Sequence, residues 1–318
     1  MEKIRVGILG AGNIAEKHLE VLRSFDDVEL AGICNSGNPR IHTLAQRLSI
    51  AKTFDDYRRL LDEVEMDAAL VLVSVTKVPA VTTECLTRGL PVLIEKPPAL
   101  SVAATESLAR LANQYDCLNM VALNRRFYSV MQRAREAILE AGPLVSMVVE
   151  APERIADYRA AGHPDEVVNN ILFANGIHCI DLFRYFGGEV AAVMNASNRW
   201  FENQNDSYNA LLRFENGATG HYISNWTSPG RWSVNLYGQD RKVTLAPLER
   251  GTVLQRDGQQ YDLPIDSVDE NYKPGIYAQA RYFIDCVRDK KRPAFPAADL
   301  DDAVKTMKLV EAIRGGAA

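Results

Sequence analysis

The sequence predicts an α/β protein, in which a doubly wound parallel sheet is followed by an α+β domain with a large, mostly antiparallel sheet. Residues 1–123 alternate apolar strand patterns with amphipathic helix patterns, which is typical of repeated βα units. After Asn124 this alternation gives way to consecutive strand patterns separated by turn signals, as in an antiparallel sheet. We therefore expect two domains, 1–123 and 124–318.

In the first domain the expected strands are apolar on both faces, which indicates a parallel sheet covered by helices on each side. The clearest case is Ala68–Val75. The helix that follows ends before Gly89, a residue suited to the left-handed position after a helix. Strands are expected at Ile4–Leu9, Val28–Cys34, Ala68–Val75, Pro91–Ile94 and Cys117–Leu123, and helices at Ile14–Phe25, Pro39–Leu48, Tyr57–Val64, Val78–Arg88 and Ser101–Tyr115.

The second domain begins with an amphipathic helix, ends with two more, and is dominated by strand patterns between them. Tight-turn signals at Glu215–Gly217 and Gln255–Gly258 separate successive strands. The segment Ala151–Asn170 is polar and irregular. Strands are expected at Leu144–Glu150, Val190–Arg199, Ser207–Phe214, Thr219–Asn225, Trp232–Tyr237, Lys242–Ala246 and Thr252–Arg256, and helices at Ser129–Glu140, around His178, at Gly275–Arg288 and at Ala298–Arg314.

The composition excludes several classes of protein. The 36 basic and 41 acidic residues give a net charge of -5, and no basic cluster indicates a nucleic-acid partner. The apolar stretches are too short for a membrane span, and the strand at Ile4 leaves no room for a signal peptide, so we expect a cytoplasmic protein. The five cysteines and five histidines lack metal-ligand spacing, so no metal site is predicted and the cysteines are expected to be buried thiols.

The most informative motif is a glycine loop directly after the first strand, with the form G-x-G-x-x-A from Gly10 to Ala15. Gly10 permits a sharp turn, Gly12 lets the backbone approach a diphosphate, and Ala15 allows the next helix to pack on the strand. The free amides at the start of that helix, at Asn13 and Ile14, can bind the diphosphate with the help of the helix dipole. The loop predicts a dinucleotide site.

The end of the second strand selects between the two nicotinamide dinucleotides. An acid in this position binds the ribose 2′-hydroxyl of NAD and repels the 2′-phosphate of NADP. This chain has no acid there. Asn35 and Ser36 can donate hydrogen bonds, and Arg40 can pair with a phosphate. The sequence therefore slightly favours NADP, and NAD stays open.

Further along the chain, Glu95-Lys96-Pro97 directly follows the expected strand Pro91–Ile94, and Asn124-Arg125-Arg126-Phe127 lies at the domain junction. With the glycine loop, the segment Gly176–Leu182 and the closing pair of helices, these motifs make the whole chain resemble the Gfo/Idh/MocA oxidoreductase family. The resemblance implies a Rossmann domain and a second domain whose open sheet forms the contacts of a homodimer or homotetramer. It also implies hydride transfer between a nicotinamide and a sugar, polyol or related hydroxy compound.

The resemblance also implies roles for individual residues. Lys96 is expected beside the nicotinamide and the substrate hydroxyl, where a partly desolvated lysine can pass on protons or stabilise an alkoxide. His178 is expected to accept the hydroxyl proton while hydride leaves the same carbon. The remaining residues expected to bind the cofactor are Ser74, Val75, Glu95 and Asn124, and those expected to bind substrate with Lys96 and His178 are Arg125 and Asn175.

The chain departs from the family pattern in two places. Ala174 occupies the position of the usual Asp, four residues before the histidine, and Val78 occupies a position that is commonly His. An amide such as Asn175 cannot act as a base, so either His178 works with Lys96 alone or the chemistry differs from a plain alcohol dehydrogenation. Asp181, one turn beyond His178, is expected either to orient the imidazole or to make helix contacts.

The substrate is the least determined part of the prediction. Several arginines near the expected site can read an anionic group, although solvated surface arginines are the commoner case. Tryptophans can stack on a sugar face or bury at a subunit interface, and the segment Ala151–Asn170 is expected to form a lid. The arginines are Arg125, Arg126, Arg154, Arg159 and Arg199, and the tryptophans are Trp200, Trp226 and Trp232.

Three functions are compatible with these motifs. The first is an NAD(P)-dependent dehydrogenase or reductase that acts on a carbohydrate-like alcohol or ketone, which retention of Lys96 and His178 favours. The second is a dinucleotide-binding sensor without catalysis, which Ala174 favours. The third is an NAD-dependent glycoside hydrolase that oxidises the sugar transiently and returns the hydride.

Overall fold

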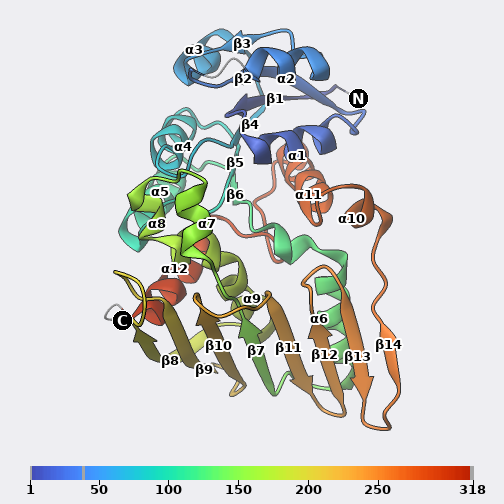
Figure 1. The fold of residues 1–318 in the computed structure, drawn as a ribbon. Coiled ribbons are helices and arrows are strands. Elements are labelled where there is room, and N and C mark those ends of the chain that lie inside the picture. The colour runs from blue at the N-terminus through green and yellow to red at the C-terminus, as the bar shows by residue number, and fades with distance from the viewer. Residues whose placement is uncertain (1, 38–39, 316–318) are drawn as a thin grey trace. The chain divides into compact units, whose positions relative to one another are not determined.

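The computed structural model describes residues 2–37 and 40–315, with Arg40 described for its backbone alone. The chain divides into two compact units. The first comprises Met1–Asn124 and Val268–Val304, and the second comprises Arg125–Ser267 and Lys305–Ala318. Each unit has its own sheet (Figure 1).

The first unit is built on a six-stranded sheet in the order β3-β2-β1-β4-β5-β6. Every pairing in it is parallel, which confirms the predicted doubly wound sheet. β4 ends at Val71 rather than Val75, and β3 was not predicted because two residues carry no periodicity. The strands are β1 (Ile4–Leu9), β2 (Val28–Cys34), β3 (Thr53–Phe54), β4 (Ala68–Val71), β5 (Val92–Ile94) and β6 (Asn119–Val121).

Five helices follow the strands of this sheet in alternation, as expected from the sequence. Local caps fix two of the helix starts: the Asp56 carboxylate accepts a hydrogen bond from the Arg58 amide, and the Ser101 hydroxyl accepts one from the Ala104 amide. Figure 1 shows helices on both sides of the sheet, and the strand residues of β4 and β5 are buried throughout. The helices are α1 (Asn13–Leu22), α2 (Arg40–Leu48), α3 (Tyr57–Glu63), α4 (Val78–Thr87) and α5 (Val102–Gln114).

A segment from the C-terminal part of the chain completes this unit, whereas the sequence had assigned all residues after 123 to the second domain. It contains most of α10 (Ser267–Asn271), α11 (Ile276–Asp289) and the start of α12 (Leu300–Arg314). The Asp27 carboxylate binds the guanidinium groups of Arg281 at 2.9 Å and Arg288 at 2.7 Å. These ion pairs join groups about 250 residues apart along the chain, so no local pattern indicates them.

The second unit contains an eight-stranded sheet in the order β14-β13-β12-β11-β7-β10-β9-β8. The β7–β10 pairing is parallel and the other pairings are antiparallel, which confirms the predicted sheet. The strands are β7 (Ser146–Glu150), β8 (Val190–Asn198), β9 (Ser207–Phe214), β10 (Thr219–Asn225), β11 (Ser233–Gly238), β12 (Arg241–Leu245), β13 (Gly251–Gln255) and β14 (Gln260–Asp262).

Helices cover one face of this sheet and leave the other exposed. α6 (Ser129–Ala141) packs on β11 to β13, and α9 (Ile177–Gly187) packs on β7, β8 and β10. On the opposite face Met194 is 72% exposed, and Leu211 and Ile223 are also exposed. The segment predicted to be irregular, Ala151–Asn170, contains two short helices, α7 (Ile155–Ala160) and α8 (Asp165–Val168).

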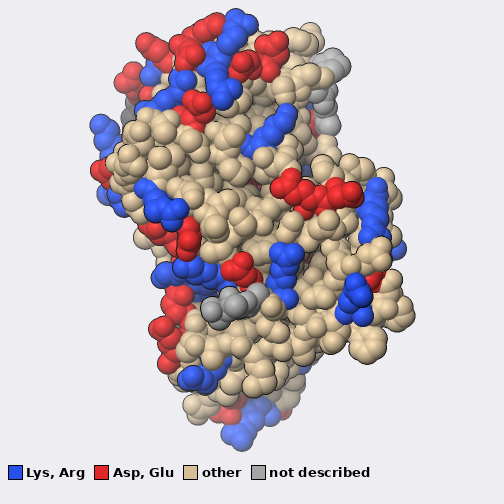
Figure 2. Space-filling view, turned by 90° about the vertical axis from the view of Figure 1, so that its left-hand side faces the viewer, with Lys and Arg blue, Asp and Glu red and all other residues tan. Residues whose placement is uncertain are grey.

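The surface carries charges of both signs. On the face drawn in Figure 2, blue and red side chains are interspersed, and neither sign covers a continuous area. Within the described residues, none of the helices combines the length and apolar character required to span a membrane.

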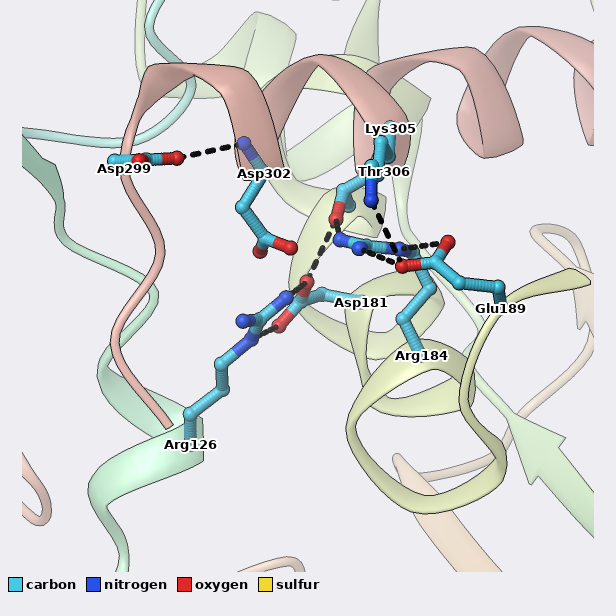
Figure 3. A network of polar contacts seen from close by, with 8 residues as sticks. All are labelled: Arg126, Asp181, Arg184, Glu189, Asp299, Asp302, Lys305 and Thr306. Carbon is cyan, nitrogen blue, oxygen red and sulfur yellow. Dashed lines mark hydrogen bonds and ion pairs between the residues drawn. The ribbon is translucent and has the colours of Figure 1, made fainter. Parts of the chain in front are cut away.

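A buried ionic network joins α9 to the rest of the second unit (Figure 3). Arg126 lies in the 3₁₀ helix Asn124–Phe127 and forms a bidentate ion pair with Asp181 of α9, with distances of 2.6 and 2.7 Å. Asp181 also accepts a hydrogen bond from the Thr306 hydroxyl at 2.8 Å, and Thr306 accepts one from Arg184 at 2.9 Å. Arg184 in turn pairs with Glu189 at 2.7 Å. These contacts favour the structural alternative for Asp181 over a role in orienting His178.

We predict that Asp181→Ala lowers the free energy of unfolding by about 3–5 kcal/mol, because it leaves the Arg126 guanidinium buried without its carboxylate. Arg126 and Asp181 are 2% and 1% exposed. The control is Asp157→Ala, which breaks an exposed pair with Arg154 and should cost less than about 1 kcal/mol. Urea unfolding of the two variants measures both values, and equal losses would contradict the prediction.

Candidate active site

The glycine loop has the geometry of a phosphate-binding turn. Gly10 has φ +117°, and a Cβ atom there would lie 2.3 Å from the Leu72 carbonyl oxygen, so glycine is required on both grounds. Gly12 is exposed and a Cβ atom on it would meet nothing within 4 Å. In the described part of the chain no side-chain hydrogen bond caps α1 at Gly12, and amides at the start of a helix can bind a diphosphate.

Asn35 links the glycine loop to the end of β2. Its side-chain oxygen accepts a hydrogen bond from the Ala11 amide at 3.3 Å, while the Cys34 carbonyl accepts one from the Gly10 amide at 2.8 Å. A cavity of about 350 Å³ opens beside Asn35. Its lining residues are Asn35, Gly37, Ile41, His42, Thr53, Phe54, Asp55 and Arg59.

Ser36, the second residue of the coenzyme-selecting position, has a cation beside it. The Lys77 ammonium donates a hydrogen bond to the Ser36 hydroxyl at 3.3 Å. Lys77 directly precedes α4 and is exposed, as is Ser36. The sequence did not indicate this lysine, because 41 residues separate the pair. The side chain of Arg40, which the sequence assigned to the same position, lies outside the described residues.

The other predicted cofactor residues follow the carboxyl ends of β4 and β5, where ligands bind in doubly wound sheets. Ser74 is exposed and Val75 half-buried in the turn after β4. Glu95 and Lys96 follow β5 and are half-buried. The Glu95 carboxylate lies 3.8 Å from the buried His18 imidazole of α1, so it contacts the helix that begins at the glycine loop.

The Asn124 side chain makes a hydrogen bond within the first unit. It is 6% exposed, and its amide donates a hydrogen bond to the Pro274 carbonyl at 3.0 Å. Val78, which replaces a histidine of the family pattern, is buried at the start of α4.

In the second unit His178 lies in the first turn of α9, directly after a π-helical turn at Leu172–Gly176. Such turns frequently occur at functional sites. His178 is 7% exposed, and its ring centroid lies 6.2 Å from that of Trp232. The Arg125 guanidinium stacks on the same indole, 4.7 Å from its centroid. The structure therefore brings together His178 and Arg125, two of the predicted site residues, on one aromatic ring.

Asn175, the third predicted substrate residue in this unit, is bound to a carboxylate that sequence reasoning missed. Its amide donates hydrogen bonds to both oxygens of Glu153, at 2.9 and 3.2 Å. The Tyr158 hydroxyl donates another to Glu153 at 3.1 Å. Glu153 lies in the segment predicted to be an irregular lid, and a single acid in a polar stretch gives no signal of burial.

The remaining arginines and tryptophans have separate roles. Arg126 binds Asp181 in the buried network, whereas Arg154 and Arg159 pair with Asp157 and Glu202. Trp226 is 5% exposed and donates to the Ser224 hydroxyl, and Trp200 is 69% exposed. Trp232 is thus the tryptophan that accompanies His178. The Nε–H of Arg125 is buried and has no hydrogen-bond partner among the described residues.

These features define a class of protein. A glycine turn between β1 and α1, next to the point where the strand order reverses, is the architecture of a dinucleotide-binding Rossmann domain. Residues 4–123 match the family described as "Oxidoreductase family, NAD-binding Rossmann fold". Residues 144–244 match the "GFO/IDH/MocA C-terminal domain". The chain belongs to the Gfo/Idh/MocA oxidoreductase family.

Known relatives cover almost the whole chain. It is 23% identical to myo-inositol 2-dehydrogenase of Thermotoga maritima, over 93% of this chain and 92% of that one. It is 24% identical to trans-1,2-dihydrobenzene-1,2-diol dehydrogenase of Mus musculus, over 93% and 92%. An oxidoreductase from Agrobacterium radiobacter, solved with NAD+, L-tartaric acid and magnesium, shares the fold with a TM-score of 0.83 at 18% identity, covering 98% of this chain and 95% of that one.

We predict that Gly12→Ala weakens dinucleotide binding at least about 10-fold without changing stability, because the added methyl group projects only into the space that a diphosphate needs. Fluorescence titration with NADPH measures the affinity. Gly10→Ala provides the contrast, since its methyl group would collide with the Leu72 carbonyl and lower the unfolding midpoint as well. Wild-type affinity in folded Gly12→Ala would contradict the assignment of the loop.

Proposed function

We propose that this oxidoreductase transfers hydride between NADP and a polyhydroxylated, carbohydrate-like alcohol or ketone. The observation that carries the proposal is the cluster of His178, Arg125 and Asn175 around Trp232 and Glu153. An indole provides an apolar surface for the C–H face of a sugar or cyclitol. The guanidinium and amide groups around it supply hydrogen bonds to several hydroxyls. The inositol and diol dehydrogenases among the relatives support this class of substrate.

A bound nicotinamide supplies the hydride acceptor in oxidation and the donor in reduction. In the oxidative direction, we assign His178 as the base that takes the proton from the substrate hydroxyl oxygen. Lys96 donates a hydrogen bond to the same oxygen and stabilises the negative charge that develops there. As the carbon loses hydride, its C–O bond becomes a carbonyl, so proton and hydride leave adjacent atoms.

NADP is the coenzyme that the end of β2 favours. Ser36 and Lys77 together provide a hydroxyl and an ammonium for a 2′-phosphate. Asp55 lines the adjoining cavity and is the acid there that can bind the ribose hydroxyl of NAD instead. The Ser36–Lys77 pair favours NADP because a cation binds a phosphate dianion more strongly than a hydroxyl.

We predict that Lys77→Ala weakens NADPH binding about 5- to 30-fold, the loss of one charge-assisted hydrogen bond of about 1–2 kcal/mol. NADH binding should change less than about 2-fold, because NADH lacks the 2′-phosphate that the ammonium would bind. Titration of wild-type and variant protein with both coenzymes measures the difference. Equal weakening of the two, or a wild-type protein that prefers NADH, would contradict this choice of coenzyme.

The open face of the eight-stranded sheet is the surface that we assign to a second copy of the chain. Met194 and Leu211 are paired across β8 and β9, and Ile223 lies on the same face of β10. Large exposed apolar side chains on one sheet face are typical of subunit interfaces. A homodimer or homotetramer through this face would cover them.

We predict that His178→Asn and Lys96→Met each lower kcat about 100- to 10 000-fold, the range expected for loss of a proton-transfer group. The assay is coenzyme reduction with NADP+ or NAD+ and a panel of myo-inositol, D-glucose, D-xylose and D-gluconate. NADPH binding by His178→Asn should stay within about 3-fold of wild type, since the histidine acts on substrate. The proposed function fails if wild-type protein binds the coenzyme but oxidises none of these compounds, or if both variants turn over normally.

A further inference from the structure

The helix that carries His178 lacks an acid where the family pattern has one. Position 174 is Ala, in the π turn before α9. A histidine that accepts a proton becomes a cation, and a nearby carboxylate stabilises that charge. The question is whether another element of the second unit supplies the missing carboxylate.

Glu153 is a buried carboxylate three residues beyond the end of β7. It is 5% exposed, and burying a charge is costly unless it is hydrogen-bonded. Donors from two other elements meet it: Asn175 of the π turn at 2.9 Å and Tyr158 of α7 at 3.1 Å. Burial and the nearby Glu153 raise the pKa of Tyr158 far above its usual value, so the phenol keeps its proton and remains a donor.

Three observations place Glu153 beside the first turn of α9. Asn175, which binds it, lies in the π turn that leads directly into α9, three residues before His178. Trp232, which contacts the His178 ring, donates its indole N–H to the carbonyl of Pro152, the residue before Glu153, at 3.1 Å. The pKa of the Cys179 thiol is raised by burial, lowered by Arg125 and raised by Glu153, so both charges act on the residue next to His178.

The hydrogen bonds also fix the direction of the Asn175 amide. Its N–H₂ group is directed to the two Glu153 oxygens, which leaves its carbonyl oxygen to accept a hydrogen bond. A substrate hydroxyl is the matching donor. Glu153 therefore fixes the orientation of the Asn175 side chain, so that its carbonyl oxygen, and not its N–H₂ group, faces a ligand.

We propose that Glu153 is the positioning carboxylate of this site, which replaces the acid absent at position 174 and reaches the same region from the end of β7. This inference rests on the proposed function. When the substrate hydroxyl gives its proton to His178 and its carbon gives hydride to NADP+, the Glu153 carboxylate stabilises the imidazolium. It keeps its own charge throughout and holds Asn175 with its carbonyl oxygen directed to a second hydroxyl.

The test compares Glu153→Gln with the double variant Glu153→Gln/Ala174→Asp. Glutamine keeps the shape and one acceptor oxygen but removes the charge. We expect Glu153→Gln to lower kcat about 10- to 100-fold, as expected for a misplaced or uncompensated catalytic group, with NADPH affinity unchanged. Adding Ala174→Asp should recover most of the lost kcat, because it returns a carboxylate to the helix. The substrate is the compound oxidised fastest by wild-type protein in the panel of myo-inositol, D-glucose, D-xylose and D-gluconate.

A control variant separates this role from a structural one. Glu202→Gln removes a carboxylate that is bound through Arg159 to α7, the helix that carries Tyr158, and should leave kcat unchanged. The proposal is overturned if Glu153→Gln turns over like wild type, or if it is impaired and Ala174→Asp restores nothing. Wild-type protein without turnover would overturn the proposed function, and this inference with it.

Discussion

The close approach of two backbones at the carboxyl end of β1 is the constraint on which the cofactor site depends. A Cβ atom on Gly10 would lie 2.3 Å from the Leu72 carbonyl, so the turn exists only because the residue has no side chain. The strand order reverses at this point, with β2 on one side of β1 and β4 on the other. The same turn therefore lies next to Asn35, which accepts a hydrogen bond from the Ala11 amide, and next to the strand ends that precede the other residues predicted to bind the cofactor.

Local patterns in the sequence were sufficient to predict the fold and the sharp turn at Gly10. Strands that are buried on both faces, such as β4, are apolar throughout and indicate a parallel sheet without any tertiary information. The glycine loop is readable because its function requires a particular residue at each of a few adjacent positions. His178 and Lys96 were found through short motifs of the family rather than through periodicity. Their roles remain a proposal.

Contacts between distant segments could not be predicted. Glu153 appeared as one acid in a polar stretch, and its burial depends on donors from α7 and the π turn that bring it to Asn175. The contact between Lys77 and Ser36, on which the proposed preference for NADP depends, joins residues far apart in the sequence. The grouping of residues 268–304 with the first unit depends likewise on Asp27, whose partners lie near the other end of the sequence.

Two buried carboxylates lie near the start of α9. Asp181 makes a bidentate ion pair with Arg126, and Glu153 accepts hydrogen bonds from Asn175 and Tyr158. Titration of the wild-type protein with NADPH, followed by nicotinamide fluorescence, tests whether this chain is a nucleotide-dependent dehydrogenase. We expect saturable binding at micromolar concentration with one site per chain. No binding of NADPH or NADH at millimolar concentration would contradict it.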